Sequence, residues 1–414
     1  MGLAESRADS GSVDGASLGW GTRAVMAGGG LLSALALVGI LSVLPKIAAD
    51  QAHGPQDGML VKQLIGIVSL AMVLGSPLAG VLVDRLGLRR VLVSAALIYA
   101  VAGTAGLYLD GLKPLVASRF FVGVAGATIQ IIAFTLINTR LEPQQRARWM
   151  GIHVSFAMIG TIVIQPLAGM LGEAGWRWPF ALYAIGLLVA VAALLDRSLD
   201  DRAPLARPGP AERDAGSQSF LSWFPLRFLP LGFGIGAIAF LPMVHLPFLL
   251  REHGLTSTSL ITLVLTADSM VGAVMAFLYG RARKSCSTNA AFAFSFAMTG
   301  LGTLIAALSP GTMGVIGGML VFGFGVGWMV PNLMTAVASK VSLARQGRTA
   351  GLVKAAHFLS TPLCIPLMEP FVRKYGAQSA MFAVSALAFA LFCLLVYRIR
   401  TSQSPGESVS AVPV

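Results

Sequence analysis

The stretch GVLVDRLGLRR (residues 80–90) concentrates four charges, Asp84, Arg85, Arg89 and Arg90, in seven residues of a chain that is 56% hydrophobic and 12% charged. Apolar runs of about 20 residues, each long enough to cross ~30 Å of hydrocarbon, flank it on both sides. Soluble proteins carry about a quarter of their residues as charged side chains. The stretch is therefore expected to be a short charged loop between two membrane spans, and its surroundings predict an all-α polytopic membrane protein.

Twelve such apolar runs divide the chain. They cover residues 24–46, 60–83, 90–109, 114–138, 149–173, 179–196, 224–250, 258–280, 287–308, 312–336, 349–371 and 376–397. The longest polar interruption is rich in Pro, Gly and mixed charge, which predicts a linker. The expected organisation is a tail (1–23), a six-helix bundle (24–196), a linker (197–222), a second six-helix bundle (223–398) and a tail (399–414).

The distribution of basic residues predicts the orientation. With the N-terminus inside, 21 of the 30 Lys and Arg residues fall in cytoplasmic segments, six in outer segments and three within spans or at their edges. This bias predicts a multi-pass protein of the plasma (inner) membrane with both termini and the linker in the cytoplasm. The net charge of +12 is spread over short loops and forms no stripe typical of nucleic-acid binding.

The chain repeats itself at an offset of 200 residues. The matched pairs are Gly80 with Gly280, Gly123 with Gly323, Arg140 with Lys340, Arg148 with Arg348, Gly151 with Gly351, and Pro166-Leu167 with Pro366-Leu367. A constant offset across several spans predicts two pseudo-symmetric bundles related as parallel repeats. That architecture is typical of a transporter with a central site between its halves.

Several motifs resemble the major facilitator superfamily, and within it the drug:proton antiporter-like branch. Residues 80–90 match the family's loop between helices 2 and 3, although Leu88 stands where a basic residue is usual. Arg119 with Gly123 is similar to the fourth-helix motif, Arg146, Arg148 and Gly151 to the basic loop 4–5, and GWRWPF (175–180) to a common entry to helix 6. Helix 5 departs from the exporter pattern, because Gln165 precedes Pro166 where those proteins usually have Gly, and helix 1 carries no acidic residue.

The resemblance implies a conformational gate at the cytoplasmic end of helix 2. Asp84 is expected to meet the beginning of helix 11, near Arg348, when the cytoplasmic side is closed, and the helix dipole favours a carboxylate there. The gate set comprises Gly80, Asp84, Arg85, Gly87, Arg89, Arg90, Arg140, Arg148 and Arg348. The arginines of the 80–90 stretch also have an ordinary role, which is to fix orientation beside anionic head groups.

Asp268 is the only acidic residue in the middle of a predicted span. A charge at bilayer depth costs about 2.5–3.5 kcal/mol on insertion scales, so it needs a reason. A carboxyl that binds and releases a proton between two access states is what proton coupling requires; the alternative is a structural partner for a neighbouring helix. Arg119 is a second candidate for proton or substrate contact, with snorkelling near a helix end as its alternative.

The candidate substrate site is one face of helix 11. Lys354, His357 and Thr361 share that face, which is expected to bind an anionic group or to pair with Asp268. The further candidates are Gln130 on helix 4, His245 on helix 7, and Trp328 and Asn332 on helix 10, each with a packing or hydrogen-bonding alternative. Since cations and histidines outnumber Asp268, we expect a neutral or anionic amphipathic substrate.

Missing motifs narrow the function. The chain has no phosphate-binding loop, so we expect no ATP. Its five histidines and three cysteines lack metal-ligand spacing, and it has no nucleophile elbow, so we expect neither a metal, nor another cofactor, nor an enzyme. The leading hypothesis is a monomeric secondary transporter that works by alternating access and couples efflux of a small organic molecule to protons. The alternatives are a proton-coupled importer of an organic acid, sugar or siderophore-like solute, and a non-transporting sensor or scaffold.

Overall fold

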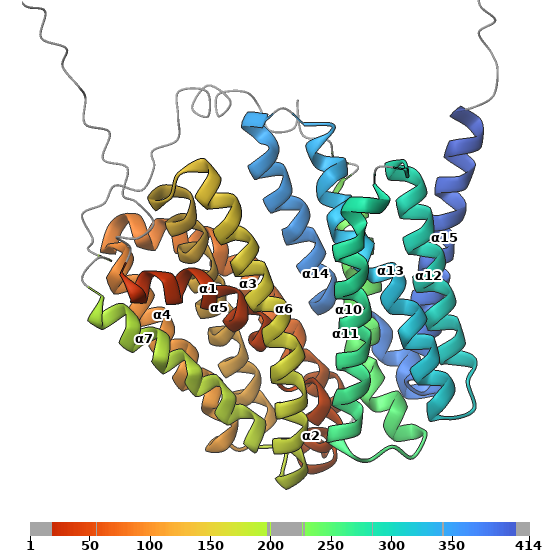
Figure 1. Ribbon diagram of the computed structural model, residues 1–414. Coiled ribbons are helices and arrows are strands. Elements are labelled where there is room, and N and C mark those ends of the chain that lie inside the picture. The colour runs from red at the N-terminus through yellow and green to blue at the C-terminus, as the bar shows by residue number, and fades with distance from the viewer. Residues whose placement is uncertain are drawn as a thin grey trace, which may run out of the picture. The chain divides into compact units, whose positions relative to one another are not determined.

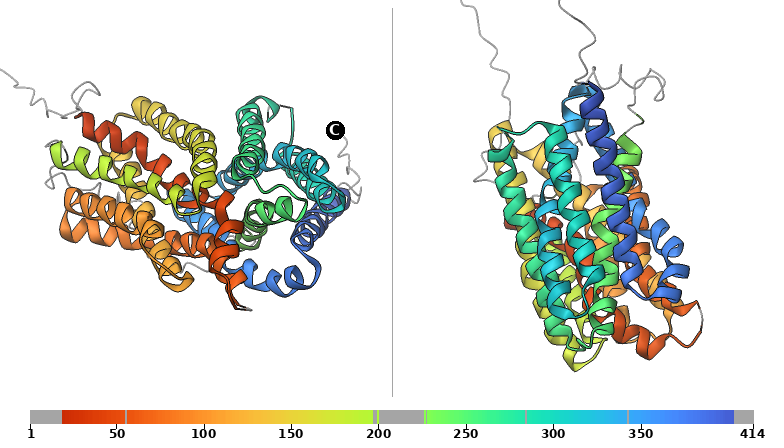
Figure 2. Two further views of the ribbon diagram at one scale, coloured as in Figure 1. Left: turned by 90° about the horizontal axis from the view of Figure 1, so that it is seen from below. Right: turned by 90° about the vertical axis from the view of Figure 1, so that its right-hand side faces the viewer.

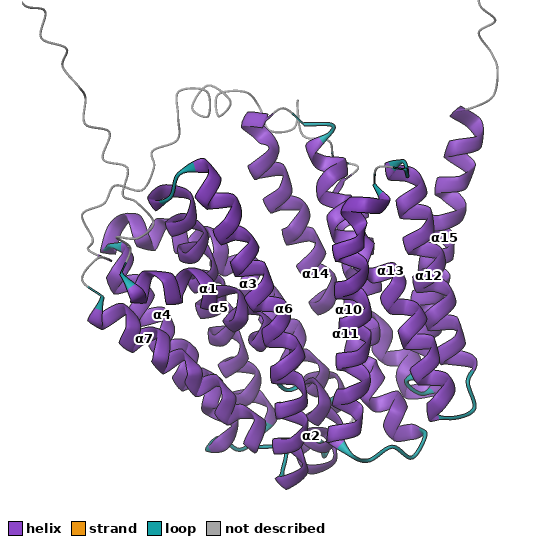
Figure 3. Cartoon of the chain, viewed as in Figure 1, coloured by secondary structure: helices purple, strands orange, loops and turns teal. Residues whose placement is uncertain are grey.

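The computed structural model describes residues 19–54, 56–196, 199, 226, 228–283, 285–341 and 343–402. Within that part of the chain every regular element is a helix, and none is a strand (Figures 1 and 3). The predicted tails as far as residue 18 and beyond residue 402, and the predicted linker apart from residue 199, lie outside the described residues.

The first six spans confirm the prediction to within a few residues. They consist of α1 (Trp20–Val38) with η2 (Leu41–Val43) and α2 (Leu44–Gln51), α3 (Asp57–Leu86), α4 (Leu88–Gly103) with η3 (Thr104–Leu107), α5 (Leu112–Arg140), α6 (Pro143–Ala174), and η4 (Trp178–Ala184) with α7 (Ile185–Leu195). The turn between α3 and α4 is made by Gly87, whose φ of 90° lies in the left-handed region that glycine adopts without strain.

The last six spans are single helices, also as predicted. They are α10 (Phe228–Glu252), α11 (Thr258–Ala282), α12 (Thr288–Leu308), α13 (Thr312–Ala338), α14 (Leu343–Tyr375) and α15 (Gln378–Ser402). Ser257 and Ser287 cap the beginnings of α11 and α12 by accepting the backbone N–H groups of Leu260 and Ala290. The helix starts of α4, α5, α6 and of α12, α13, α14 differ by 200 residues, which is the offset of the sequence repeat.

The chain forms two compact units. The first comprises Met1–Gly39, Leu70–Ile164 and Phe180–Arg207, and the second comprises Ile40–Ser69, Gln165–Pro179 and Pro208–Val414. The predicted division into two six-helix halves stays a prediction.

In the first unit, α1 and α4 each pack against α5 and α7. Buried hydroxyls join these helices, because the Tyr99 and Tyr183 hydroxyls donate to the carbonyls of Leu32 and Leu35 on α1. At one end of the unit the Asp196 carboxylate accepts the backbone N–H and the hydroxyl of Thr22.

In the second unit, α12 lies between α13 and α15, α11 packs on α13, and α10 packs on α14 (Figures 1 and 2). Glycines allow the closest of these contacts. A Cβ on Gly236 of α10 would lie 2.1 Å from the carbonyl oxygen of His357 on α14, and one on Gly302 of α12 would lie 2.5 Å from the carbonyl oxygen of Gly318 on α13.

Candidate functional site

Asp268 is buried on α11, where its side chain faces α13. The residue is 3% exposed, and its Oδ1 atom has no hydrogen-bond partner among the described residues. A Cβ built on Gly323 of α13 would lie 3.0 Å from this oxygen. The carboxyl group therefore lies against a glycine in a seam between two helices.

A different face of α11 carries hydroxyl groups that contact α6. The Thr258 hydroxyl donates to the Gly169 carbonyl, and the Thr266 hydroxyl lies 3.3 Å from Oε1 of Gln165. Gln165 is 1% exposed and its Nε2 atom has no partner. Gln165, which stands where the exporters usually have Gly, therefore places a buried amide against α11, the helix that carries Asp268.

Lys354 and His357, two of the three residues predicted to share a face of α14, lie beside aromatic rings. The Lys354 ammonium lies 5.9 Å from the centre of the Phe358 ring, and the His357 ring packs 5.2 Å from that of Phe240 on α10. Lys354 is exposed, His357 is half-buried with its Nδ1 atom unpartnered, and Thr361 is fully buried with its hydroxyl unpartnered. Within the described part of the chain, no ion pair joins Lys354 to Asp268.

A buried ion pair lies further along α14. Lys62 of α3 donates to Oε2 of Glu369 at 2.8 Å, and Arg373 lies 3.2 Å from Oε1 of the same carboxylate. Lys62 and Glu369 are only 4% and 5% exposed, and the ring of Phe248 lies 5.4 Å from the Lys62 ammonium. Glu369 lies near the end of α14 and not in the middle of a span, and its pairing with Lys62 is a feature that the sequence alone did not predict.

His245 lies on α10, the helix that also carries Phe248. It is fully buried; its Nδ1 atom lies 2.9 Å from the Leu241 carbonyl, and its Nε2 atom has no partner. The bond of Nδ1 lies within α10, whereas the hydrogen-bonding alternative expects a bond to another helix, and Nε2 has no partner among the described residues.

Polar bonds also tie the ends of α2 and α6 to α10 and α11 in the second unit. Arg251 donates to the Pro45 carbonyl at 2.6 Å. The Glu173 carboxylate accepts the Ser257 hydroxyl at 2.5 Å and the Ser259 backbone N–H at 2.9 Å, so it lies at the beginning of α11, where the helix dipole favours a negative charge. Lys46 lies 3.4 Å from the same carboxylate.

Arg119 lies in the first unit and is fully buried. Its guanidinium donates to the carbonyls of Ala102 and Gly103 at the end of α4 and lies 4.9 and 4.6 Å from the rings of Phe180 and Tyr183. The snorkelling alternative is therefore wrong for this residue. Its neighbours make a helix-capping, cation–π site, and the proton-coupling role stays a prediction.

The remaining substrate candidates lie elsewhere. Trp328 donates to the Met275 carbonyl, and Asn332 donates to the Thr288 carbonyl and accepts the Tyr279 hydroxyl. These bonds hold α13 against α11 and α12, which is the packing role given above as the alternative to substrate binding. Gln130 is half-buried on α5 in the first unit.

The predicted gate residues surround the turn at Gly87. Asp84, Arg85, Arg90 and Arg148 are exposed, and a Cβ on Gly80 would meet nothing within 4 Å. Arg89 donates to the carbonyls of Ala193 and Leu194 on α7, and Arg140 is half-buried in the last turn of α5. The side chain of Arg348 lies outside the described residues, so its expected contact with Asp84 stays a prediction.

Comparison with known proteins gives the family. Residues 26–363 match the Major Facilitator Superfamily. The chain is 24% identical over 383 residues to the class C tetracycline resistance protein of Escherichia coli, covering 89% of this chain and 94% of that protein. It is also 24% identical to the multidrug resistance protein MdtL of Klebsiella pneumoniae, covering 82% and 93%.

Other matches are shorter or more distant. The match to the multidrug resistance protein MdtM of Salmonella typhimurium is 28% identical over 159 residues and spans only 37% of that protein. The match to multidrug resistance protein 1 of Bacillus subtilis spans 62% of its length. A solved D-xylose-proton symporter shares the fold, with a TM-score of 0.73 at 15% identity, over 91% of this chain and 96% of that one.

Twelve spanning helices, an internal repeat and the loop 2–3 motif all agree with that match, which covers well over half of the 414 residues. The chain belongs to the Major Facilitator Superfamily of membrane transporters.

Proposed function

We propose that this transporter exports a small organic molecule across the inner membrane in exchange for protons. The relatives matched over most of their length are named for resistance to tetracycline or to many drugs, which supports export of a toxic compound. The excess of basic residues in alternate loops supports a topology with both termini in the cytoplasm.

The observation that carries the proposed proton coupling is the uncompensated carboxyl of Asp268. A carboxyl group is neutral when it holds a proton and charged when it releases it. In a seam where Oδ1 has no partner among the described residues and lies against Gly323 of α13, each change of state alters the free energy of burial. A rearrangement of α11 against α13 would therefore be linked to proton binding, which is what an antiporter requires.

The face of α14 is the proposed substrate contact. Lys354 supplies a positive charge, Phe240 and Phe358 supply aromatic surface, and the free polar atoms of His357 and Thr361 supply hydrogen-bonding groups. A site of mainly apolar surface with a few polar groups is what small-molecule recognition uses. This composition supports a neutral or anionic aromatic substrate in preference to a simple cation.

The bonds within the second unit are proposed as the outer gate. Under the proposed topology, the bonds from Arg251 to Pro45, from Ser257 to Glu173 and from Lys62 to Glu369 lie toward the outer ends of the spans. They hold the outer parts of α2, α3 and α6 against α10, α11 and α14. Opening to the outside requires these bonds to break, while the 80–90 stretch is the proposed cytoplasmic counterpart.

A susceptibility panel tests the proposed export. A strain that lacks the gene and one that overproduces the protein are compared across toxic compounds of different charge, beginning with tetracycline. Export predicts that overproduction raises the inhibitory concentration of at least one neutral or anionic aromatic compound. For that compound, everted vesicles energised by respiration should accumulate it; accumulation only in right-side-out vesicles would establish an importer instead.

A further inference from the structure

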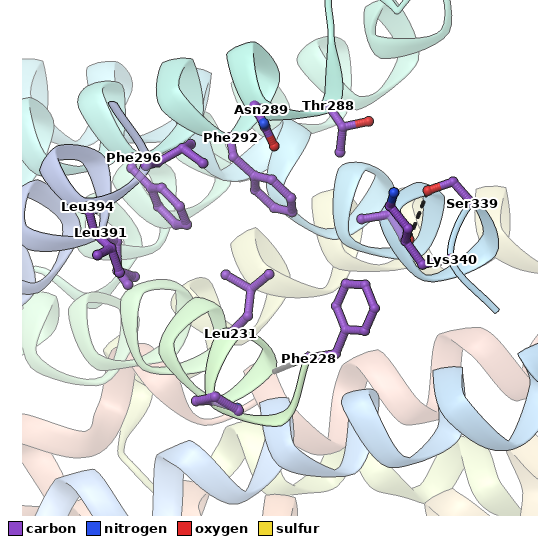
Figure 4. A pocket seen from close by; sticks show the side chains of 13 residues that line it. Phe228, Leu231, Thr288, Asn289, Phe292, Phe296, Ser339, Lys340, Leu391 and Leu394 are labelled. Carbon is purple, nitrogen blue, oxygen red and sulfur yellow. Dashed lines mark hydrogen bonds between the residues drawn. The ribbon is translucent and has the colours of Figure 1, made fainter. Parts of the chain in front are cut away.

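A cavity lies in the second unit, and none of its lining residues belongs to α14. Its volume is about 560 Å³, and it is lined by the beginnings of α10 and α12, the end of α13 and the last part of α15 (Figure 4). A pocket of this size holds a drug-sized molecule or a long hydrocarbon chain. None of the groups that we assign to transport lines it.

The cavity is polar at one end and apolar at the other. Thr288, Ser339 and Lys340 gather at one end of Figure 4, whereas Phe296 and Leu394 lie at the other. The polar end coincides with the first residue of α12 and with the residues just after α13. Phe296 is eight residues deeper along α12, which is about 12 Å at 1.5 Å per residue.

The charge at the polar end is positive. Lys340 lines the cavity, and Arg283 donates to the Thr288 hydroxyl at 2.7 Å, which places a second cation beside it. Of the described residues that line the cavity, none is acidic. The cations are at the level of the helix ends, where lipid head groups lie, and Leu394 at the apolar end is 51% exposed.

The corresponding place in the first unit carries an arginine. There Arg89, which corresponds to Asn289 at the offset of 200, donates to the carbonyls of Ala193 and Leu194 and ties α4 to α7. Asn289 instead lines the open cavity, together with Leu394, the counterpart of Leu194. The shorter side chain leaves a space where the repeat has an arginine.

We propose that this cavity is a binding site for an anionic phospholipid of the bilayer. The head group lies beside Lys340 and Thr288, and an acyl chain runs along Phe292 and Phe296 toward Leu394. The lipid fits the cavity in charge and in length. Its negative head group would lie beside the cations at the helix ends, and its hydrocarbon would extend about 12 Å inward along the apolar residues. This site is independent of the proposed export.

The test measures lipid retained by the purified full-length protein. Delipidated protein is offered palmitoyl-oleoyl phosphatidylglycerol or the matching phosphatidylcholine, and bound lipid is counted by native mass spectrometry, with the shift in thermal unfolding as a second readout. Wild type should retain the phosphatidylglycerol preferentially. Lys340→Ala should reduce that preference about fivefold, because one Lys near an anionic surface contributes about 1 kcal/mol.

Two further variants separate the cavity from general surface charge. Leu394→Trp should fill the apolar end and reduce retention of both lipids, whereas Leu194→Trp, at the same repeat position and 52% exposed, should not. Asn289→Arg should close the cavity as Arg89 does and lower phosphatidylglycerol retention despite its added charge.

Three results would overturn the proposal. They are an unchanged lipid preference in Lys340→Ala, equal losses in Leu394→Trp and Leu194→Trp, and increased phosphatidylglycerol retention in Asn289→Arg. Stabilisation of wild type by inorganic phosphate as strong as that by phosphatidylglycerol would assign the site to a free anion instead of a lipid.

Discussion

Glu369 and Asp268 are both buried carboxyl groups in the second unit, yet their surroundings differ. Glu369 is held between Lys62 at 2.8 Å and Arg373 at 3.2 Å. Asp268 is just as buried, but its Oδ1 atom has no partner and a glycine faces it. One carboxylate is compensated by two cations, whereas among the described residues no cation forms an ion pair with the other.

The difference separates two uses of a buried acid. A carboxylate that is paired with a cation holds two segments together, and removing either partner leaves an uncompensated charge. A carboxyl without such a partner is free to change its protonation state as its surroundings change. We therefore propose that Glu369 belongs to the outer gate and that Asp268 binds the coupled proton. The following predictions test this division of roles between the two acids.

The largest effect on stability is expected at the paired acid. Glu369→Gln leaves the Lys62 ammonium buried without its carboxylate, which should lower the free energy of unfolding by about 3–5 kcal/mol. Thermal unfolding in detergent measures this. The double variant Lys62→Met/Glu369→Met should recover most of the loss, because it removes both charges. A single variant as stable as wild type would mean that the pair does not hold the segments together.

A smaller loss of stability is expected on the other side of the α11–α13 seam. A Cβ on Gly323 would lie 2.9 Å from the Asp268 carbonyl oxygen and 3.0 Å from Oδ1, so Gly323→Ala must shift one helix. Overpacking of this kind costs about 1–3 kcal/mol. Gly317→Ala on the same helix is the control, because a Cβ there would meet nothing within 4 Å. Equal stability of the two variants would show that the seam is not tightly packed.

The unpaired acid itself should tolerate neutralisation. Asp268→Asn keeps the shape of the side chain and breaks no ion pair among the described residues, so the free energy of unfolding should change by less than the roughly 1 kcal/mol of a typical point substitution. The comparison with Glu369→Gln under identical conditions is decisive. If both substitutions destabilise the protein equally, Asp268 has a compensating partner and the division between the two acids is wrong.

The smallest effect on stability is expected at the exposed gate. Asp84→Asn should leave unfolding unchanged, because the side chain is exposed, but it should slow transport by weakening the cytoplasmic closure. Binding of a transported compound to the purified variant should stay close to wild type. Normal transport rates in Asp84→Asn would show that this contact is dispensable.

The spans and the repeat could be predicted because both depend on local composition and fixed spacing. Twelve long apolar runs leave few alternatives for the fold, and the 200-residue offset recurs in the helix starts. The position of Asp268 inside a span was predictable for the same reason, because the ten residues on either side of it are all apolar or small and polar.

The pairing of charges was not predictable from local patterns. Lys62 and Glu369 are 307 residues apart, and the sequence around each residue does not indicate which residue it pairs with. Two signals were present: opposite charges inside two spans, and Arg373 four residues after Glu369. The surroundings of Arg119 were hidden in the same way, because they depend on Phe180 and Tyr183 in a distant segment.

Proton movement in everted vesicles tests the assignment of Asp268 most directly. Respiration acidifies the vesicle interior, and a fluorescent amine reports the gradient while a compound found by the susceptibility panel is added. We predict that the compound releases protons from vesicles containing wild type or Ser269→Ala, and that Asp268→Asn abolishes this release while the purified variant still binds the compound. Release at the wild-type rate by Asp268→Asn would contradict the account.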